Sequence, residues 1–159
     1  MKKTKYVILF LVMEPLAFNK RAVYDYELLE NFEGGLVLTG AEVKSVKAGH
    51  IQLKGAFIMI RNGELWLKNA LISRYEPAGP QEDYDQYRNR KILMRHRDIN
   101  RLIGKINTQG LTLVPIKVYT LRNLIKLSFA LARGKKKFEK RAAIKKREID
   151  RQIREKMRE

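Results

Sequence analysis

Residues 56 to 72 read AFIMIRNGELWLKNALI, and this stretch holds the clearest local signal of the fold. Two apolar runs, Ala56 to Ile60 and Glu64 to Ile72, are separated around Arg61-Asn62-Gly63. An Asn-Gly pair between strands favours a type I′ turn, because both central residues of that turn need positive φ angles. The sequence therefore predicts a β-hairpin in the middle of the chain.

Two further strands are expected before this hairpin. Val23 to Glu30 is a candidate for the first, and residues 36–38 are a candidate for the second. Gly34-Gly35 separates them, which predicts a bulge or bend at that point.

Two more strands are expected near the end of the globular part, at Leu111 to Tyr119 and Ile125 to Ala132. Pro115 marks an edge or a bulge, because proline cannot donate a ladder hydrogen bond. In the last strand apolar residues alternate with Lys126, Ser128, Ala130 and Ala132, which predicts one buried and one open face.

Two short helices are expected between these strands. Gly40 to Ala48 is the first, with Gly49 placed to end it and Glu42, Lys44 and Lys47 on its exposed face. The second is indicated by Ile99, Leu102, Ile103 and Ile106 at helical spacing after Asp98, a plausible cap, and Gly110 follows it. Pro77 to about Tyr87 reads as a long polar loop of a kind that often carries function.

These elements predict a mainly β fold with short α-helices. A small OB-like antiparallel β-barrel with flanking helices and a basic C-terminal tail is the expected architecture, although periodicity alone does not separate a barrel from a sandwich. The expected domain organisation is an apolar and basic leader at 1–18, the barrel at 19–133 and the tail at 134–159.

The tail is set apart by its composition. From Arg133 onward thirteen Lys and Arg residues against five Asp and Glu residues leave a net charge of +8. Its apolar residues, among them Phe138, Ile149 and Ile153, form only a thin helical stripe. An isolated helix of this length is marginal in water, so the tail is expected to be disordered when free and helical when docked.

Charge dominates the whole chain, because 34 Lys and Arg against 17 Asp and Glu give a formal net charge of +17. Such an excess favours a polyanion partner, since neutralising phosphates releases condensed counterions. Nucleic acid is the expected partner, and an anionic membrane surface is the competing one.

The leader resembles a secretory signal only in part. Lys2, Lys3 and Lys5 precede an apolar run from Tyr6 to Met13, but Glu14-Pro15 follows and the cleavage-site pattern is poor. The run is too short to cross a membrane, which takes about 20 apolar residues. We expect an extended leader that packs on the domain or stays loose, and a cytoplasmic protein, in keeping with the absence of cysteine.

Motifs for catalysis are missing from the sequence. There is no phosphate-binding or dinucleotide-binding glycine loop and no paired-histidine metal motif, so no cofactor and no metal are expected. His50 and His96 lie in different segments, and Glu33 with Glu42 is the one conceivable acid/base pair. We therefore predict that the protein is not an enzyme.

Basic residues interleaved with aromatic residues occur in two places instead. Asn19-Lys20-Arg21 leads into Tyr24 and Tyr26, and Arg88, Arg90 and Lys91 follow Tyr84 and Tyr87. Looped RNA is typically held by cations on phosphates and by aromatic rings under bases. A single aromatic residue in a strand is more often part of the core, so the clustering is the evidence.

Five ordered motifs resemble the small protein B family. They are NKRAVYDY (19–26), EGGLVLTGAEVKS (33–45), RNRKIL (88–93), GLTLVPIKVY (110–119) and ARGKKKFEKR (132–141). The resemblance runs from Asn19 to about Glu148.

The resemblance implies an OB-like barrel that binds the tRNA-like domain of tmRNA and delivers it to stalled ribosomes in trans-translation. It also implies a tail that enters the empty mRNA channel of the small subunit, next to the decoding centre. A monomer bound 1:1 to tmRNA, without a membrane partner, is expected.

By motif match, Asn19, Glu33 and Leu93 fall at positions that the family uses to grip tmRNA. The full expected tmRNA-binding set is Asn19, Lys20, Arg21, Tyr24, Tyr26, Glu33, Glu42, Lys44, Arg88, Arg90, Lys91 and Leu93. The expected ribosome-binding set in the tail is Arg133, Lys135, Lys136, Lys137, Phe138, Lys140, Arg141, Lys145, Lys146 and Arg147.

The chain departs from the family pattern at some positions. Tyr24 stands where His is usual, and Phe138 stands where Tyr or His is usual, so a titratable group and a hydrogen bond are lost. Residues 81–87 lack the usual His and Pro, and the apolar leader is atypical. Three rival hypotheses stay open: a generic ribosome-associated or single-stranded RNA-binding OB protein, a membrane-surface protein, and a nuclease using Glu33 and Glu42.

Overall fold

The computed structural model describes residues 14–80 and 82–157, apart from the side chains of Thr108, Gln109, Lys137, Phe138, Ala143 and Lys156. The expectations for the apolar run at Tyr6 to Met13, and for the side chains of Lys137 and Phe138, therefore lie outside the described part.

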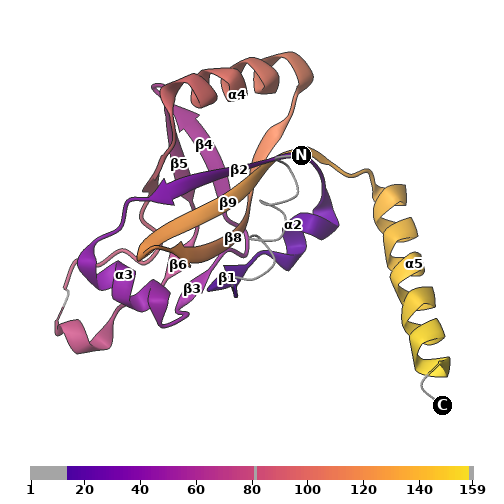
Figure 1. Cartoon of the computed structure of the whole chain (residues 1–159), viewed down its shortest axis with the longest axis horizontal. Helices are drawn as coiled ribbons and strands as arrows, with labels where there is room; N and C mark the ends of the chain where they lie inside the picture. Colours follow the sequence, from indigo (N-terminus) through magenta and orange to yellow (C-terminus); the bar gives the residue numbers. More distant parts are fainter. Residues whose placement is uncertain (1–13, 81, 158–159) are drawn as a thin grey trace.

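The protein is mainly β-structure with short helices, as predicted (Figure 1). The strands are β1 (Ala17–Phe18), β2 (Tyr26–Leu36), β3 (Ile51–Gln52), β4 (Phe57–Arg61), β5 (Glu64–Lys68), β6 (Leu71–Ile72), β7 (Arg90–Leu93), β8 (Thr112–Leu121) and β9 (Leu124–Gly134). The helices are α2 (Lys20–Asp25), α3 (Gly40–Lys47), the 3₁₀ turn η1 (Glu76–Ala78), α4 (His96–Gln109) and α5 (Lys137–Lys156).

Within the described residues, seven strands form one antiparallel sheet in the order β1-β8-β4-β5-β7-β2-β9, and β8 also pairs with β9. The pairings thus run round six strands and return to β8. The contact between β4 and β8 is short, with Ile58 opposite Leu113 as its one register pair. β3 and β6 form a separate two-stranded sheet.

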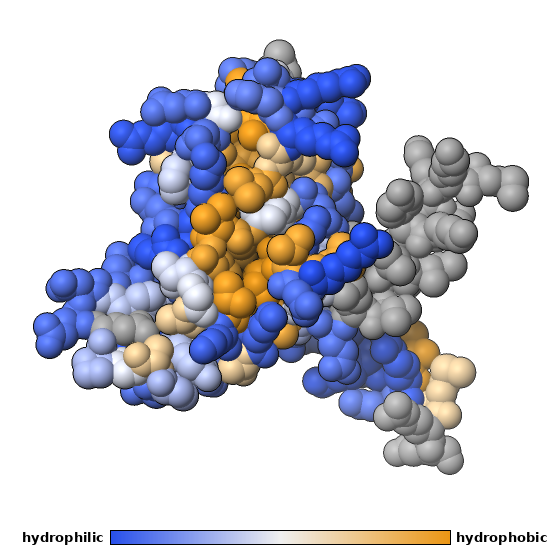
Figure 2. Space-filling view, turned by 60° about the vertical axis from the view of Figure 1, so that its left-hand side comes forward, coloured by the Kyte–Doolittle hydropathy of each residue, from blue (hydrophilic) through white to orange (hydrophobic). Residues whose placement is uncertain are grey.

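The core fills the inside of this curved sheet. Leu65, Leu67, Ile92, Leu127 and Phe129 are all buried there at 0–1% exposure. α4 lies over one end of the sheet and α3 near the other, while α5 projects away from the body (Figure 1). Figure 2 shows hydrophobic residues gathered in the middle of one face, with hydrophilic residues around them.

The prediction of an open face on the last strand is wrong. Ser128, Ala130 and Ala132 are as buried as the apolar residues between them. Ala130 and Ala132 belong to a second small cluster with Val114 and with Ala22 of α2. Alternation did not reveal this because the elements that cover the outer face of β9 come from distant parts of the sequence.

The segment from Val23 to Glu30 is wrongly predicted as a strand in its first part. Residues up to Asp25 belong to α2, and one long strand, β2, then continues through Gly34-Gly35 to Leu36. The predicted break into two strands is therefore also wrong. The register shift in β2 lies between Leu28 and Glu30.

Gly34 has a packing role in place of the predicted bulge. A Cβ atom at this position would lie 2.4 Å from Cγ2 of Ile92 and 3.0 Å from the carbonyl oxygen of Leu93. Glycine therefore lets β2 and β7 approach closely, which is needed for their pairing at Gly35 and Leu36.

Several turn predictions are confirmed. Asn62 and Gly63 have φ angles of 52° and 72°, as a type I′ turn requires. Gly49, with φ 84°, follows α3, and Gly110, with φ 60°, caps α4. The register of β8 shifts between Pro115 and Lys117, which confirms a bulge.

Two boundary predictions are wrong. α4 begins at His96, so Asp98 lies in its first turn and does not cap it. The run from Glu64 to Ile72 is broken into β5 and β6, with Asn69 at a φ of 56° between them. A positive φ at Asn69 redirects the chain, and asparagine tolerates this conformation better than most residues.

Candidate RNA-binding surface

Glu33 lies on the outer face of β2 and is held by two neighbouring strands. Lys126 Nζ of β9 lies 2.7 Å from Glu33 Oε1, and the Tyr119 hydroxyl of β8 donates a hydrogen bond to Oε2. The strand register brings these three side chains together. Lys126 is paired with Tyr119 on β8 and with Gly35 on β2, and Glu33 lies two residues before Gly35 on the same face of β2. The carboxylate is thus fixed in position while about a third of its side chain stays exposed.

The charge states within this group are well defined. Burial alone raises the pKa of Glu33, but hydrogen bonds from Lys126 and Tyr119 outweigh it and hold the pKa below its usual value. Burial, together with donation to the Glu33 carboxylate, raises the pKa of Tyr119 above its usual range. At neutral pH the carboxylate is ionised and the phenol is protonated, so Glu33 presents acceptor lone pairs suited to base amino groups or a 2′-hydroxyl.

Exposed apolar side chains lie beside this carboxylate. Leu93, paired with Gly35, is 55% exposed, and Val37, just beyond β2, is 43% exposed. Fixed polar groups next to exposed apolar ones can contact both the edges and the sugar faces of an RNA loop. We name Glu33, Leu93, Tyr119 and Lys126 the Glu33 surface.

Sequence reasoning found Glu33 and Leu93 but missed Tyr119 and Lys126. The alternation in the last strand predicts Lys126 on the face opposite the apolar one, and Tyr119 is the last residue of the predicted strand at 111–119. What was missing was the register of β8 against β9, which a single sequence does not contain.

Asn19 has an anchoring position. It is 7% exposed, its Oδ1 accepts from the Ala22 amide, and its Nδ2 donates to the Pro115 carbonyl at 3.0 Å. It therefore caps α2 and ties that helix to the bulge in β8. The cap thereby fixes the start of the helix that carries the exposed Lys20 and Arg21.

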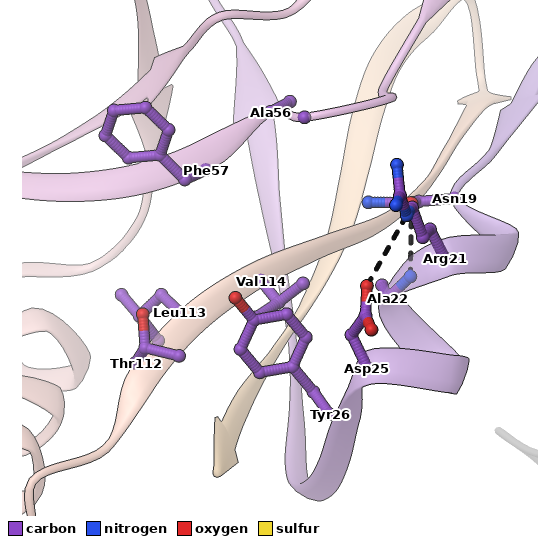
Figure 3. Close-up of a pocket in the computed structure, with 11 residues that line it drawn as sticks. Asn19, Arg21, Ala22, Asp25, Tyr26, Ala56, Phe57, Thr112, Leu113 and Val114 are labelled. Atoms are coloured by element: carbon purple, nitrogen blue, oxygen red, sulfur yellow. Dashed lines mark hydrogen bonds and ion pairs between the residues drawn. The ribbon is translucent and has the colours of Figure 1, made fainter. Parts of the chain in front are cut away.

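A hollow of about 530 Å³ lies between α2, β4 and β8 (Figure 3). The rings of Tyr26 and Phe57 line it, and Arg21 pairs with Asp25 across α2 at 3.6 Å. Tyr24, also in α2, lies 6.0 Å from the guanidinium carbon of Arg147. Of the cation and aromatic cluster predicted at 19–26, Arg21 and Tyr26 therefore line this hollow, whereas Tyr24 contacts α5.

Glu42 is wrongly predicted on the exposed face of its helix. It is 1% exposed, and its carboxylate accepts from Arg88 Nε at 2.8 Å and from Arg90 Nε at 3.0 Å. Its Oε2 also accepts from the Thr39 amide. The 0% exposed Arg90 further donates to the carbonyls of Ala70 and Gln86.

Glu42 and Arg90 are buried in this network, so RNA cannot reach them. Their contacts are structural, because Arg90 donates to the Gln86 carbonyl and holds the loop around Gln86 in place. Burial opposes ionisation of Glu42, but the hydrogen bonds from Arg88 and Thr39 hold its pKa below the usual value. Hydrogen bonding to Glu42 raises the pKa of Arg88. A heptad or strand pattern does not reveal this pairing, because Glu42 and its arginines are more than forty residues apart.

Two further residues of the expected tmRNA-binding set, Lys44 and Lys91, lie at the surface. Lys44 is exposed, with its Nζ 5.7 Å from the centre of the Tyr75 ring. Lys91 pairs with Glu64 on β5.

The tail begins where β9 ends at Gly134, and α5 follows. Lys135 Nζ donates to the Val23 carbonyl at 3.1 Å, and Lys140 Nζ lies 2.9 Å from Asp25 Oδ1, so the start of α5 meets α2. Arg133, Lys136, Arg141, Lys145, Lys146 and Arg147 are exposed. The predicted disorder of the free tail stays a prediction.

The surroundings of Glu42 argue against the nuclease hypothesis, which paired this residue with Glu33. The oxygens of Glu42 are taken up by Arg88, Arg90 and Thr39, so this carboxylate cannot share a metal ion with Glu33. Among residues 14–80 and 82–157, no group of acidic or histidine side chains could hold a metal ion. In the same ranges none of the helices has the length and apolar character that crossing a membrane requires.

Comparison with known proteins identifies similar chains. The family described as SmpB protein matches residues 16–159. The SsrA-binding protein of Trichormus variabilis is 47% identical over 135 residues, which cover 85% of this chain and 87% of that protein. The SsrA-binding protein of Coprothermobacter proteolyticus is 46% identical over 143 residues, covering 89% and 95%.

A solved structure is also similar. A chain from the work "tmRNA-SmpB: a journey to the center of the bacterial ribosome" is 45% identical, with a TM-score of 0.62 over 76% of this chain and 84% of that chain.

Proposed function

The chain belongs to the SmpB family, and from this premise we propose that it binds the tRNA-like domain of tmRNA and delivers it to stalled ribosomes for trans-translation. The family is one of RNA-binding proteins and not of enzymes. The relatives carry the name SsrA-binding protein, and the similar solved chain comes from a study of tmRNA on the ribosome.

The Glu33 surface is the observation that carries the tmRNA part of the proposal. Glu33 and Leu93 stand at positions matched to the family's tmRNA grip, and Lys126 with Tyr119 fixes the carboxylate between them. Pre-oriented groups on strands recognise one RNA shape better than groups on a loose segment, because less ordering is needed on binding. In our proposal the curved sheet is an OB-like barrel that serves as this rigid platform.

The tail supplies the second half of the proposal. We infer that the barrel and the tRNA-like domain together imitate a tRNA in the vacant decoding site. The cations of α5 then enter the empty mRNA channel, where rRNA phosphates provide the counter-charge. The protein acts in the cytoplasm as a monomer, 1:1 with tmRNA, and senses the absence of mRNA sterically.

Sequencing the RNA that co-purifies with the full chain tests the proposal. We expect tmRNA to be enriched far above its cellular share, and competition with bulk tRNA to leave that enrichment intact. Recovery of tRNA and tmRNA in proportion to their abundance would instead favour a generic RNA-binding protein.

A further inference from the structure

Trp66 is the one tryptophan of the sequence, and it lies outside the core. Its neighbours on β5, Leu65 and Leu67, are fully buried, whereas Trp66 points to the outer face and is partly exposed. A large aromatic ring on the outer face of a strand is available for contact with a partner.

The residues around Trp66 form a small hollow with an excess of positive charge. Met59 and Lys91 are its register partners on β4 and β7. The hollow measures about 250 Å³ and is lined by Met59, Arg61, Asn62, Glu64, Trp66, Lys68 and Asn89. Lys91 pairs with Glu64 at the rim, which leaves the charges of Arg61 and Lys68.

This hollow, which we name the Trp66 hollow, is continuous with the Glu33 surface. Lys91 and Leu93 both face outward from β7, one beside Trp66 and the other beside Gly35. Gly35 is in turn paired with Lys126. An RNA segment that leaves the Glu33 surface across β7 therefore reaches Trp66 next.

We propose that the Trp66 hollow takes one unpaired RNA nucleotide, with its base stacked on the indole. Lys68 and Arg61 are placed for its phosphate, and the exposed amide of Asn89 is placed for the edge of the base. The inference rests on the proposed function and extends its RNA surface from β2, β8 and β9 onto β4 and β5.

Fluorescence gives a direct test, because emission excited in the indole band comes from Trp66 alone. The full chain is titrated in separate arms with the tRNA-like domain of tmRNA and with protein-free small-subunit rRNA, while binding is followed independently by sedimentation. We expect saturable quenching of Trp66 by at least one RNA, and the arm that quenches identifies the source of the nucleotide.

Unchanged emission at saturating RNA in both arms would overturn the inference and leave the proposed function standing. Failure of the tRNA-like domain to bind at all would overturn the proposed function and this inference with it. The two ideas are therefore separated in one titration.

Substitutions distinguish stacking from packing. Trp66→Leu should weaken binding of the quenching RNA by roughly tenfold, whereas Trp66→Phe, which keeps a ring, should restore most of the affinity. Phe18→Leu is the matched control, because Phe18 is an exposed ring on β1, outside the hollow, and it should leave affinity unchanged. Equal affinity of the Leu and Phe variants at Trp66 would contradict a stacked base.

Discussion

Basic residues are held by carboxylates in the body, whereas many of them are exposed in the tail. In the body, Glu42 fixes Arg88 and Arg90, and Glu33 fixes Lys126. In α5 the basic residues outnumber the acidic ones, and Arg141, Lys145 and Lys146 are exposed. Pinned charges suit recognition of one folded RNA, whereas loosely held charges suit a surface that is met in several orientations.

Deleting everything after Gly134 tests the different roles of the body and the tail, and we expect its effect to be the largest. We expect affinity for the tRNA-like domain to stay nearly intact, because the Glu33 surface lies in the body. Trans-translation on stalled ribosomes, measured as peptide tagging, should be lost. Binding and tagging are measured in parallel. A full-length variant with Arg141, Lys145 and Lys146 changed to Gln separates the loss of charge from the loss of length, and wild-type tagging by the truncated chain would refute the tail's proposed role.

Glu42→Ala tests the pinned charges of the body. Removing this carboxylate leaves Arg90 buried without its ionic partner, which should lower the free energy of unfolding by about 3–5 kcal/mol. Urea denaturation measures the change. Glu64→Ala is the matched control, because its pair with Lys91 is exposed and should contribute about 0–1 kcal/mol. Similar losses in both variants would show that burial of the network adds nothing.

Glu33→Gln tests the recognition group itself. The amide keeps the shape of the side chain but loses its charge, so RNA donors lose a charge-assisted bond worth about 1.5–3 kcal/mol, or about tenfold or more in affinity. Fluorescence anisotropy with labelled tRNA-like domain gives the affinity. Glu27→Gln, an exposed position on the same strand, should bind like the wild type.

The sequence was sufficient for features that depend on near neighbours. The hairpin at Asn62-Gly63, helix α3 and the bulge at Pro115 follow from local backbone preferences, and the structure has all three. What failed depended on distant partners. The burial of Glu42 and the covered face of β9 are decided by residues far away in the chain, which a local pattern does not contain.

Lowering the pH should remove the contribution that the carboxylates of Glu33 and Glu42 make to the stability of the fold. The pKa values of Glu33 and Glu42 are held below the ordinary 4.5, so the unfolded chain takes up protons first as the pH falls. Their contribution to stability is therefore full above pH 4.5 and declines as the pH falls through the lower folded pKa values. Urea titrations at several pH values should show this decline, and Glu42→Gln should make it shallower. An unchanged slope in that variant would assign the acid sensitivity to other groups.

Asp25→Asn probes the point where the two regions meet, and we expect its effect to be the smallest. Asp25 contacts Lys140 at 2.9 Å and Arg21 at 3.6 Å, and its backbone carbonyl accepts from the Lys135 amide, a bond that the substitution keeps. Both ion pairs are partly exposed, so their loss should cost at most about 1 kcal/mol.

Amide exchange along α5 shows what this junction does. If the ion pair with Lys140 orders the start of the helix, exchange there should quicken in Asp25→Asn but not in the control Asp150→Asn, whose change lies within α5 itself. Fast exchange along all of α5 in the wild type would mean that the helix is not held by the body, and it would support the predicted disorder of the free tail. Slow exchange in every variant would mean that α5 is stably docked, and a tail that enters a channel would then have to break that docking first.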